Sequence, residues 1–351
     1  MRKQIVIIRQ STLHSDHSQL MKEKTLKALF ITFCLFTLLA GTSTLAQATA
    51  KNTMSFENWV DRLRNQAFAK GISIDTLQTT FLQNKQLDLN ANTEQQPIIA
   101  APNQLQNNLT FSKLLLKQYS DTLFEISHLF GVNVEVLVAI ASLENDTIIN
   151  FSAIDVLISQ SFLRPRDTGL QNELLQALKI IDEGQIDVQQ LKSDIQGKLG
   201  KTHFKPTTFR DFAIDFNGDG RYDIWQNYPD IFASTANYLS NIGWKSGKAW
   251  GIEVSLPEAF DTKLININKQ KSLQNWQESG VFQADGNELP TSSELGSLIQ
   301  IGEGKYYIVL DNYFALLRWK RSAEYAFTVG QLVDLMQTKS TNTNNSLLKN
   351  N

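Results

Sequence analysis

Glu144 is a single carboxylate at the end of a strongly apolar segment. Residues 136–147 read VLVAIASLENDT, so an apolar run leads almost unbroken into one acid. Glu is rarely buried unless it is paired or has a chemical role. Two interpretations stay open from this segment alone. Either a helix end reaches water here, or an apolar pocket raises the pKa of Glu144 and keeps it protonated near neutral pH, as a general acid requires.

A second group of residues has the spacing of an EF-hand-type calcium loop. In DFNGDGRYDIW, residues 215–225, loop positions 1, 3, 5, 7 and 9 are filled by Asp215, Asn217, Asp219, Arg221 and Asp223. Position 7 would contribute its backbone carbonyl, and Gly220 allows the sharp turn. Gln226 stands at position 12, where Glu is usual, and Asp230 could supply the missing carboxylate. Such hard oxygen ligands favour Ca²⁺ over zinc, with an Asx-rich turn that binds no ion as the alternative.

The first fifty residues have the layout of a leader. A basic start at residues 22–27 precedes an apolar core of about thirteen residues, which is short of the ~20 that a spanning helix needs. Small residues follow at 46–50, so the sequence predicts a secretory signal peptide cleaved near residues 48–50, with Met21 as the favoured start. The single cysteine, Cys34, lies inside the apolar core rather than at a cleavage site. We therefore expect export without lipidation, and no disulfide in the mature chain.

The charge of the mature chain argues against nucleic-acid binding. The whole chain has 33 Lys and Arg and 35 Asp and Glu, and residues 1–50 hold six and two of these, which leaves 27 against 33, or −6. A mildly acidic exported protein is a poor match for a polyanion.

Helical spacing of apolar residues dominates the chain up to about residue 250. It predicts helices that include residues 111–130, 134–143, 170–183 and 231–242, with a long loop at 83–108. From about residue 252 short β-type runs appear, namely SLIQIGEG, KYYIVLDN and FALLRW, before a last helix. We therefore expect a leader at 1–50, an α-rich core at 51–250, a β-containing segment at 251–338 that completes the same module, and a disordered tail at 339–351.

Several segments match one family in order along the chain. AIASLE is followed by GKLGKTHFKPTTF, by DFNGDGRYDIW, and by residues 230–251 and 309–332. These resemble the AIxGxE segment, the AGAMGxxQFMPSSF segment, the calcium loop and the closing elements of the membrane-bound lytic transglycosylase B family of murein hydrolases. The resemblance extends from Phe56 to Leu335.

The resemblance implies a mainly α (α+β) fold, with a lysozyme-like α-rich core, an EF-hand-type calcium loop and a smaller C-terminal β-containing segment. It implies a periplasmic lytic transglycosylase that cleaves the MurNAc–GlcNAc β-1,4 bond of peptidoglycan without water. A single Glu would protonate the leaving oxygen and then accept the proton of the C6 hydroxyl, which gives a 1,6-anhydro product. Peptidoglycan glycan strands are the expected partner, with structural Ca²⁺ and no organic cofactor. Peripheral association with the cell envelope and the oligomeric state stay open.

Carried over residue by residue, the resemblance implies that Glu144 is the catalytic acid and that Tyr119 and Tyr238 lie in the substrate cleft. The calcium ligands fall on the loop residues named above and on Asp230.

Other cleft positions depart from the family. Asp194 replaces a serine, and Lys201 replaces the Gln that follows AMG. The pair Trp319 and Lys320 replaces Tyr-Asn, and NDTI after the glutamate replaces T-x-x-G. If Asp194 lines the cleft, a second carboxylate near the acid should raise its pKa further. These departures leave an alternative function, a catalytically weakened murein-binding protein that keeps the fold and the calcium site.

Overall fold

The computed structural model describes residues 54–82, 85–89, 102–145, 147, 149–302 and 304–347, with side chains of the last helix described as far as residue 337. The expected leader and its cleavage site lie outside the described residues.

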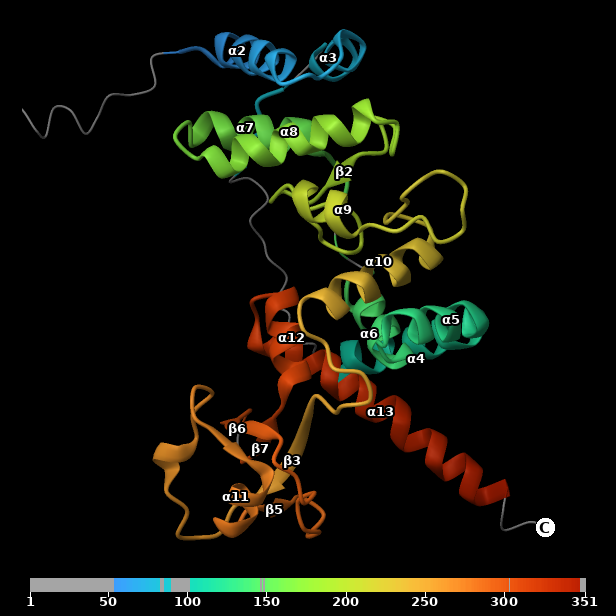
Figure 1. The fold of residues 1–351 in the computed structure, drawn as a ribbon, viewed down its shortest axis with the longest axis vertical. Helices are drawn as coiled ribbons and strands as arrows, with labels where there is room; N and C mark the ends of the chain where they lie inside the picture. Colours follow the sequence, from blue (N-terminus) through green and yellow to red (C-terminus); the bar gives the residue numbers. More distant parts are fainter. Residues whose placement is uncertain are drawn as a thin grey trace, which may run out of the picture. The chain divides into compact units, whose positions relative to one another are not determined.

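Helices make up most of the described chain (Figure 1). The α-helices are α2 (Phe56–Ala69), α3 (Ile74–Phe81), α4 (Pro102–Gln118), α5 (Ser120–Phe130), α6 (Val134–Leu143), α7 (Ala153–Leu163), α8 (Thr168–Asp182), α9 (Pro206–Phe212), α10 (Tyr228–Asn241), α11 (Leu273–Glu278), α12 (Asp311–Trp319) and α13 (Ala323–Leu347). A short 3-10 helix, η1, covers Thr262–Leu264, and a two-stranded pair joins β1 (Phe151–Ser152) to β2 (Lys192–Ser193).

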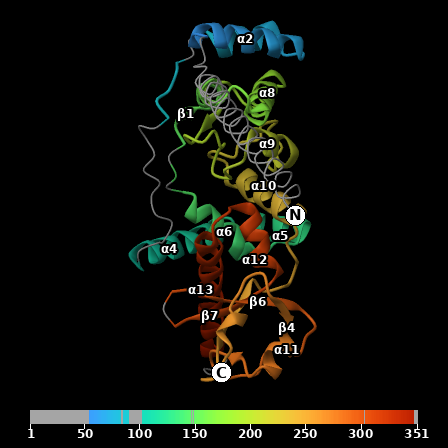
Figure 2. The ribbon, with the colours of Figure 1, turned by 90° about the vertical axis from the view of Figure 1, so that its left-hand side faces the viewer.

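Helix α6 lies at the centre of the main hydrophobic core. It packs against α4, α5, α10 and α13, and every residue from Val136 to Ser142 is buried. Figures 1 and 2 show α6 among these helices. A helix that is apolar on all sides needs neighbours on all sides, and each fully buried aliphatic side chain contributes about 1.5–3 kcal/mol. The apolar run therefore places the backbone of Glu144, which follows α6 directly, inside the fold.

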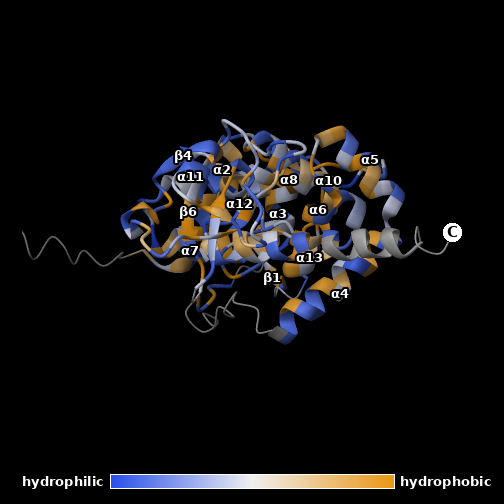
Figure 3. Ribbon diagram, turned by 90° about the horizontal axis from the view of Figure 1, so that it is seen from below, coloured by the Kyte–Doolittle hydropathy of each residue, from blue (hydrophilic) through white to orange (hydrophobic). Residues whose placement is uncertain are grey.

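Helix α4 has the two-sided pattern of a helix on the outside of this core. Figure 3 shows hydrophobic and hydrophilic residues alternating along it. Leu109, Ser112 and Leu115 are buried, whereas Thr110 and Lys117 are exposed. The buried face of α4 meets α6, where the Ser142 hydroxyl donates to the Asn108 carbonyl at 2.9 Å.

A five-stranded antiparallel sheet forms the later part of the chain, in the order β4-β6-β7-β3-β5. Its strands are β3 (Gly251–Ser255), β4 (Gln270–Ser272), β5 (Phe282–Gln283), β6 (Leu295–Gln300) and β7 (Tyr306–Val309). The sheet has its own small core around the fully buried Trp276 of α11, whose Nε1 donates to the carbonyl of Gly296 at 3.0 Å. The predicted change to β structure near residue 252 matches the start of β3.

Three predicted boundaries differ from the structure. Helix α4 begins at Pro102, inside the predicted loop, because proline suits the first turn of a helix. The segment FALLRW forms part of α12, since periodicity cannot separate a short apolar strand from a buried helix. Helix α13 continues through the expected tail as far as Leu347, in a segment without Gly or Pro to end it.

No single helix in the described ranges is long and apolar enough to cross a membrane. Helices α5 and α6 meet the length and composition criterion only as a pair bent by 112°.

Candidate active site

Glu144 caps the C-terminal end of α6 and is almost fully enclosed, with 1% of its surface exposed. Two basic side chains contact its carboxylate. The Nζ of Lys320 donates to both oxygens, at 2.9 Å to Oε1 and 3.2 Å to Oε2. The Nε2 of His203 lies 2.9 Å from Oε2, and the Thr147 hydroxyl donates to the same oxygen at 3.3 Å. Glu144 is therefore a buried, ion-paired carboxylate and not a helix end that reaches water.

The charges around Glu144 reverse the pKa shift expected from the apolar sequence. Burial by itself raises the pKa of Glu144, but the charge and contact of His203, followed by those of Lys320, hold it well below its ordinary value. The expectation of a raised pKa was wrong, because the apolar run supplies only the desolvation and the fold brings two cations to the carboxylate.

His203 reaches Glu144 from the tip of a tight loop. Leu199 and Phe204 exchange backbone hydrogen bonds of 2.7 and 3.1 Å across the base of that loop. The φ angle of His203 is 52°, and among the described residues it is the one non-glycine residue with positive φ. His tolerates this left-handed region better than most residues, and such strained positions cluster at functional sites.

Asp194 holds the other side of the His203 ring. Its Oδ1 accepts the backbone N–H groups of Gln196 and Lys198 at 2.8 and 2.9 Å, so the carboxylate has a fixed direction. Its Oδ2 lies 3.5 Å from Nδ1 of His203. Burial lowers the pKa of His203, but the charge of Glu144 and the contact with Asp194 outweigh this and raise it above its ordinary 6.5. The expectation that Asp194 raises the pKa of Glu144 was wrong, because the His203 ring stands between the two carboxylates and Asp194 does not contribute to the shift at Glu144.

Lys320 approaches from the C-terminal end of α12, and its neighbours are aromatic. Its Nζ lies 4.5 Å from the centre of the Tyr325 ring, a distance at which a cation and a ring attract. The preceding Trp319 packs against Tyr238 of α10 and against Phe204, with ring centroids 5.6 and 5.8 Å apart. The structure thus brings the predicted residues Tyr238, Trp319 and Lys320 together.

Tyr119 lies in a second aromatic cluster. Its ring centroid is 5.5 Å from that of Tyr228, whose hydroxyl is 3.4 Å from Oδ1 of Asn145. The Nζ of Lys201 donates to the same Oδ1 at 2.9 Å. Lys201 therefore contacts Asn145, the residue after Glu144, and Tyr119 is connected to Asn145 through Tyr228.

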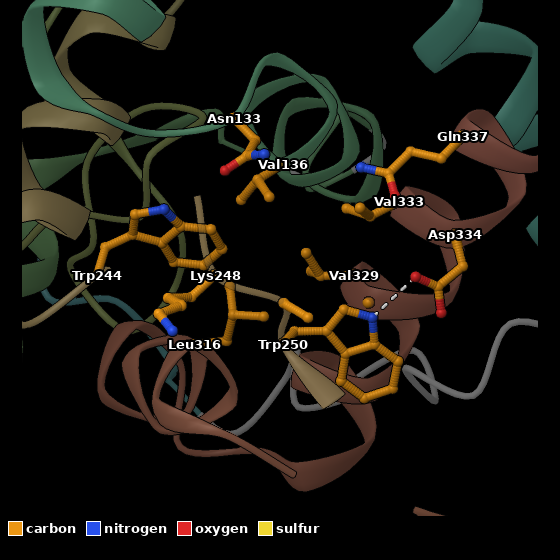
Figure 4. Close-up of a pocket in the computed structure, with 12 residues that line it drawn as sticks. Asn133, Val136, Trp244, Lys248, Trp250, Leu316, Val329, Val333, Asp334 and Gln337 are labelled. Carbon is orange, nitrogen blue, oxygen red and sulfur yellow. Dashed lines mark hydrogen bonds between the residues drawn. The ribbon is translucent and has the colours of Figure 1, made fainter. Parts of the chain in front are cut away.

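Two cavities in the described part of the chain do not include Glu144 in their lining. One of about 60 Å³ is lined by residues such as Trp244, Trp250 and Val136, and Figure 4 shows Trp250 hydrogen-bonded to Asp334 there. Val136 lies at the opposite end of α6, about 12 Å along the helix from the acid at 1.5 Å per residue. The second cavity, of about 470 Å³, lies against β3 and β7, and its lining includes Glu253 and Tyr306.

A model of the transglycosylase SLT domain matches residues 55–334. The chain belongs to this family. The membrane-bound lytic murein transglycosylase B of Escherichia coli strain K12 is 28% identical over 248 residues, 66% of this chain and 63% of that protein, so this chain spans less than two thirds of that relative.

Solved structures agree with the family assignment. SltB3 of Pseudomonas aeruginosa, in complex with NAG-anhNAM-pentapeptide, has a TM-score of 0.74 and 33% identity over 81% of this chain and 80% of that one. The Escherichia coli lytic transglycosylase Slt35, in complex with calcium, has a TM-score of 0.63 and 25% identity over 79% of this chain and 91% of that one.

Two of the groups around Glu144 distinguish this chain from the family segments quoted above. Sequence reasoning named Lys320 as a departure, but not as the ion-pair partner of Glu144. It assigned no role to His203. Laid against AGAMGxxQFMPSSF, Lys201 stands at the position directly after AMG, and His203 stands two residues later, at the Gln that precedes Phe. That replacement by a titratable residue was the signal that could have identified it.

The residue types of the 215–223 loop fit Ca²⁺, because its side chains supply hard carboxylate and amide oxygens and Gly220 takes the positive φ of 85° that the turn needs. In this structure the oxygens turn toward the loop's own backbone. Asp215 accepts the N–H groups of Gly218 and Gly220 at 2.8 Å, and Asp219 accepts that of Arg221 at 2.9 Å. Within the described ranges, no three His, Cys, Asp or Glu side chains converge on a point that could hold a metal.

Asp230 is fully buried under this loop, and both of its oxygens are occupied. They accept the N–H groups of Phe216 and Asp223, each at 2.9 Å. Burial raises the pKa of Asp230 to about 6, although these hydrogen bonds oppose the shift. Asp230 therefore ties the two ends of the loop to α10, and a role as ligand would require one oxygen to exchange its backbone partner for the ion. Asn217 donates to Asp219, and the Arg221 side chain points away, to Asp187.

Proposed function

We propose that this protein is a lytic transglycosylase that acts on peptidoglycan glycan strands, with Glu144 as its single acid/base. Family membership and the similarity to SltB3, whose complex contains a NAG-anhNAM-pentapeptide, support the reaction class. The observation that carries the residue assignment is the placement of Glu144. It is an enclosed carboxylate at the end of α6, and the nearby carboxylate of Asp194 lies behind the His203 ring.

The proposed reaction needs only one carboxyl group. Glu144 protonates the oxygen of the leaving sugar, and the same oxygen atom of Glu144 then accepts the proton of the C6 hydroxyl as O6 attacks C1. The product ends in a 1,6-anhydro ring, and no water is consumed. A hydrolase would need a second carboxylate to activate water or to form a covalent intermediate.

Mass spectrometry of muropeptides released from purified sacculi tests this proposal. Wild-type protein should release anhydro-ended products, and Glu144→Gln should reduce the rate by at least ~100-fold, the usual scale for loss of a general acid. Glu135→Gln, at the other end of α6, is the matched control and should retain activity. Full activity of Glu144→Gln would show that another group supplies the proton.

One observation favours a second candidate, a murein-binding protein with weakened catalysis. The ion pair with Lys320 stabilises the anionic form of Glu144, which cannot donate a proton. In that case neither the wild type nor Glu144→Gln would release products, yet both would pellet with sacculi.

We further propose that the protein is exported to the periplasm, loses its leader near residues 48–50, and binds one structural Ca²⁺. Calcium in the Slt35 complex and the oxygen-rich side chains of loop 215–223 support the ion. Asp215, Asn217, Asp219, Asp223 and the Arg221 carbonyl would hold it, and its role there is to stabilise the loop ahead of α10.

A further inference from the structure

The arrangement around Glu144 poses a question about the source of the proton. A general acid must carry a proton when the substrate arrives, but two cations beside a carboxylate favour its anionic form. In the described structure these cations are Lys320 and His203, both within 2.9 Å of a Glu144 oxygen. If Glu144 acts as an acid, its proton must come from a neighbour.

His203 is placed to be that neighbour. Its Nε2 lies 2.9 Å from Oε2 of Glu144, and only 11% of its side chain is exposed, so bulk water has little access to this contact. Its Nδ1 faces Asp194, and a carboxylate in this position orients an imidazole and stabilises its protonated form. To hold the ring there, the loop gives His203 a left-handed backbone conformation, with φ of 52°. Such strain is typical of functional sites and is not expected for a histidine without a role.

We propose that His203 holds the proton that Glu144 uses, and that Asp194 positions the His203 ring for this transfer. The inference rests on the proposed function, since it concerns the same acid. The bond from Nε2 to hydrogen breaks and a bond from Oε2 to hydrogen forms, so the imidazolium and the carboxylate both become neutral. After Glu144 has protonated the leaving oxygen and accepted the C6 hydroxyl proton, that proton returns to Nε2. Both His203 and Asp194 act through Glu144 and are positioning residues.

The charged groups facing His203 come from three parts of the fold. Glu144 follows α6, Asp194 follows β2, and Lys320 follows α12. The two carboxylates favour the protonated ring and Lys320 opposes it. Lys198, on the same loop, is half-buried and faces Asp194. Loss of either carboxylate should therefore release the His203 proton at a lower pH.

The first test is an NMR titration of the His203 ring in the intact protein, with its resonances assigned by their loss in His203→Asn. Asn is chosen because it tolerates positive φ. The pKa of His203 should lie above 6.5 and should fall by about one unit or more in Glu144→Gln, the effect of removing an opposite charge at this distance. Glu135→Gln should leave the pKa of His203 unchanged. A His203 pKa below 6.5, or one that Glu144→Gln does not move, would overturn the proposal.

The second test is the pH dependence of anhydro-muropeptide release. The wild-type rate should fall as the pH rises through the pKa of His203. This alkaline limb should move to lower pH by about one unit in Asp194→Asn, and further in His203→Asn, whose Glu144 keeps only Lys320 as a charged partner. His128 is an exposed histidine on α5, and His128→Asn is the matched control. Its pH–rate profile should superimpose on that of the wild type.

The two tests separate this inference from the proposed function. If the pH–rate profiles of the variants differ from the wild type only in maximal rate, and the alkaline limb does not move, His203 is merely structural. That result would overturn this inference but not the proposed function. An absence of product from the wild type at every pH would overturn the proposed function, and with it the use of this proton in catalysis. The thermal melting curve and sacculus pelleting of each variant establish that it is folded.

Discussion

Replacing Glu144 by Gln should reduce stability as well as activity. The substitution keeps the size of the side chain but leaves Lys320 and the His203 ring next to each other without a counter-ion. Removing one partner of a buried ion pair costs about 3–5 kcal/mol. Glu144 is 1% exposed, but 23% of the Lys320 side chain is exposed and its ammonium can turn toward water. We therefore expect a loss of about 3 kcal/mol, the lower end of that range.

The pH dependence identifies the ion pair as the cause. The pKa of Glu144 is lowered in the folded protein, so its contribution is complete above its ordinary value of 4.5 and is lost as the pH falls toward the folded-state value. The pKa of His203 is raised, so its contribution is present below 6.5 and is lost as the pH rises through the folded-state value. The stability difference between wild type and Glu144→Gln should be widest between these limits.

Urea denaturation at several pH values from 3 to 9 measures this difference. Lys320→Met should cost less than Glu144→Gln, because the carboxylate keeps His203 as a partner. The double variant should cost less than the sum of the two single ones, since residues in contact are not additive. A difference between wild type and Glu144→Gln that stays constant from pH 3 to pH 7 would refute the ion-pair argument, because it would reflect packing alone.

Three further predictions concern other parts of the chain. Chelation of Ca²⁺ should lower the melting temperature, because an ion bound only by the folded state stabilises it, and Asp219→Ala should reproduce the loss without chelator; unchanged melting in both would rule out the site. N-terminal sequencing of the protein from its natural compartment should begin at residues 49–51, and an intact leader would contradict export. Gly200→Ala should cost about 2 kcal/mol more than Gly184→Ala by thermal denaturation. Both glycines have positive φ, but a Cβ at Gly200 would lie 2.6 Å from the Ile224 carbonyl oxygen and one at Gly184 would meet nothing; equal losses would mean that the loop can relax.

The fold was predictable where a local pattern was strong enough to decide it. The run Val134–Leu143 is helix α6 with the bounds that its periodicity gives. By contrast, residues 111–130 form two helices separated at Tyr119, although their apolar spacing continues across the break. The apolar pattern reports which side chains are buried, and it does not report a change of direction between two helices that bury the same face.

The candidate site was predictable in part. The apolar run singled out Glu144, and the family resemblance selected Lys320 and Asp194 as departures. Their roles depend on contacts between distant segments, such as the one between Glu144 and Lys320, which are 176 residues apart. The local sequence predicts that the Glu144 carboxylate is buried, which is unfavourable. It does not predict which distant side chains compensate for that burial.

A buried carboxyl group can offset its desolvation in two ways, by taking up a proton or by pairing with cations. The sequence predicts the first for Glu144, and the structure has the second. The two states differ only in the position of one proton. With Asp194 and Glu144 negative and Lys320 and His203 positive, the cluster has no net charge. Moving the proton from His203 to Glu144 leaves that sum at zero, so the transfer requires no additional charge to be buried. The free energy of the transfer is then set by the short-range balance among four side chains, and a glycan strand that shifts Lys320 away from Glu144 would favour the protonated acid.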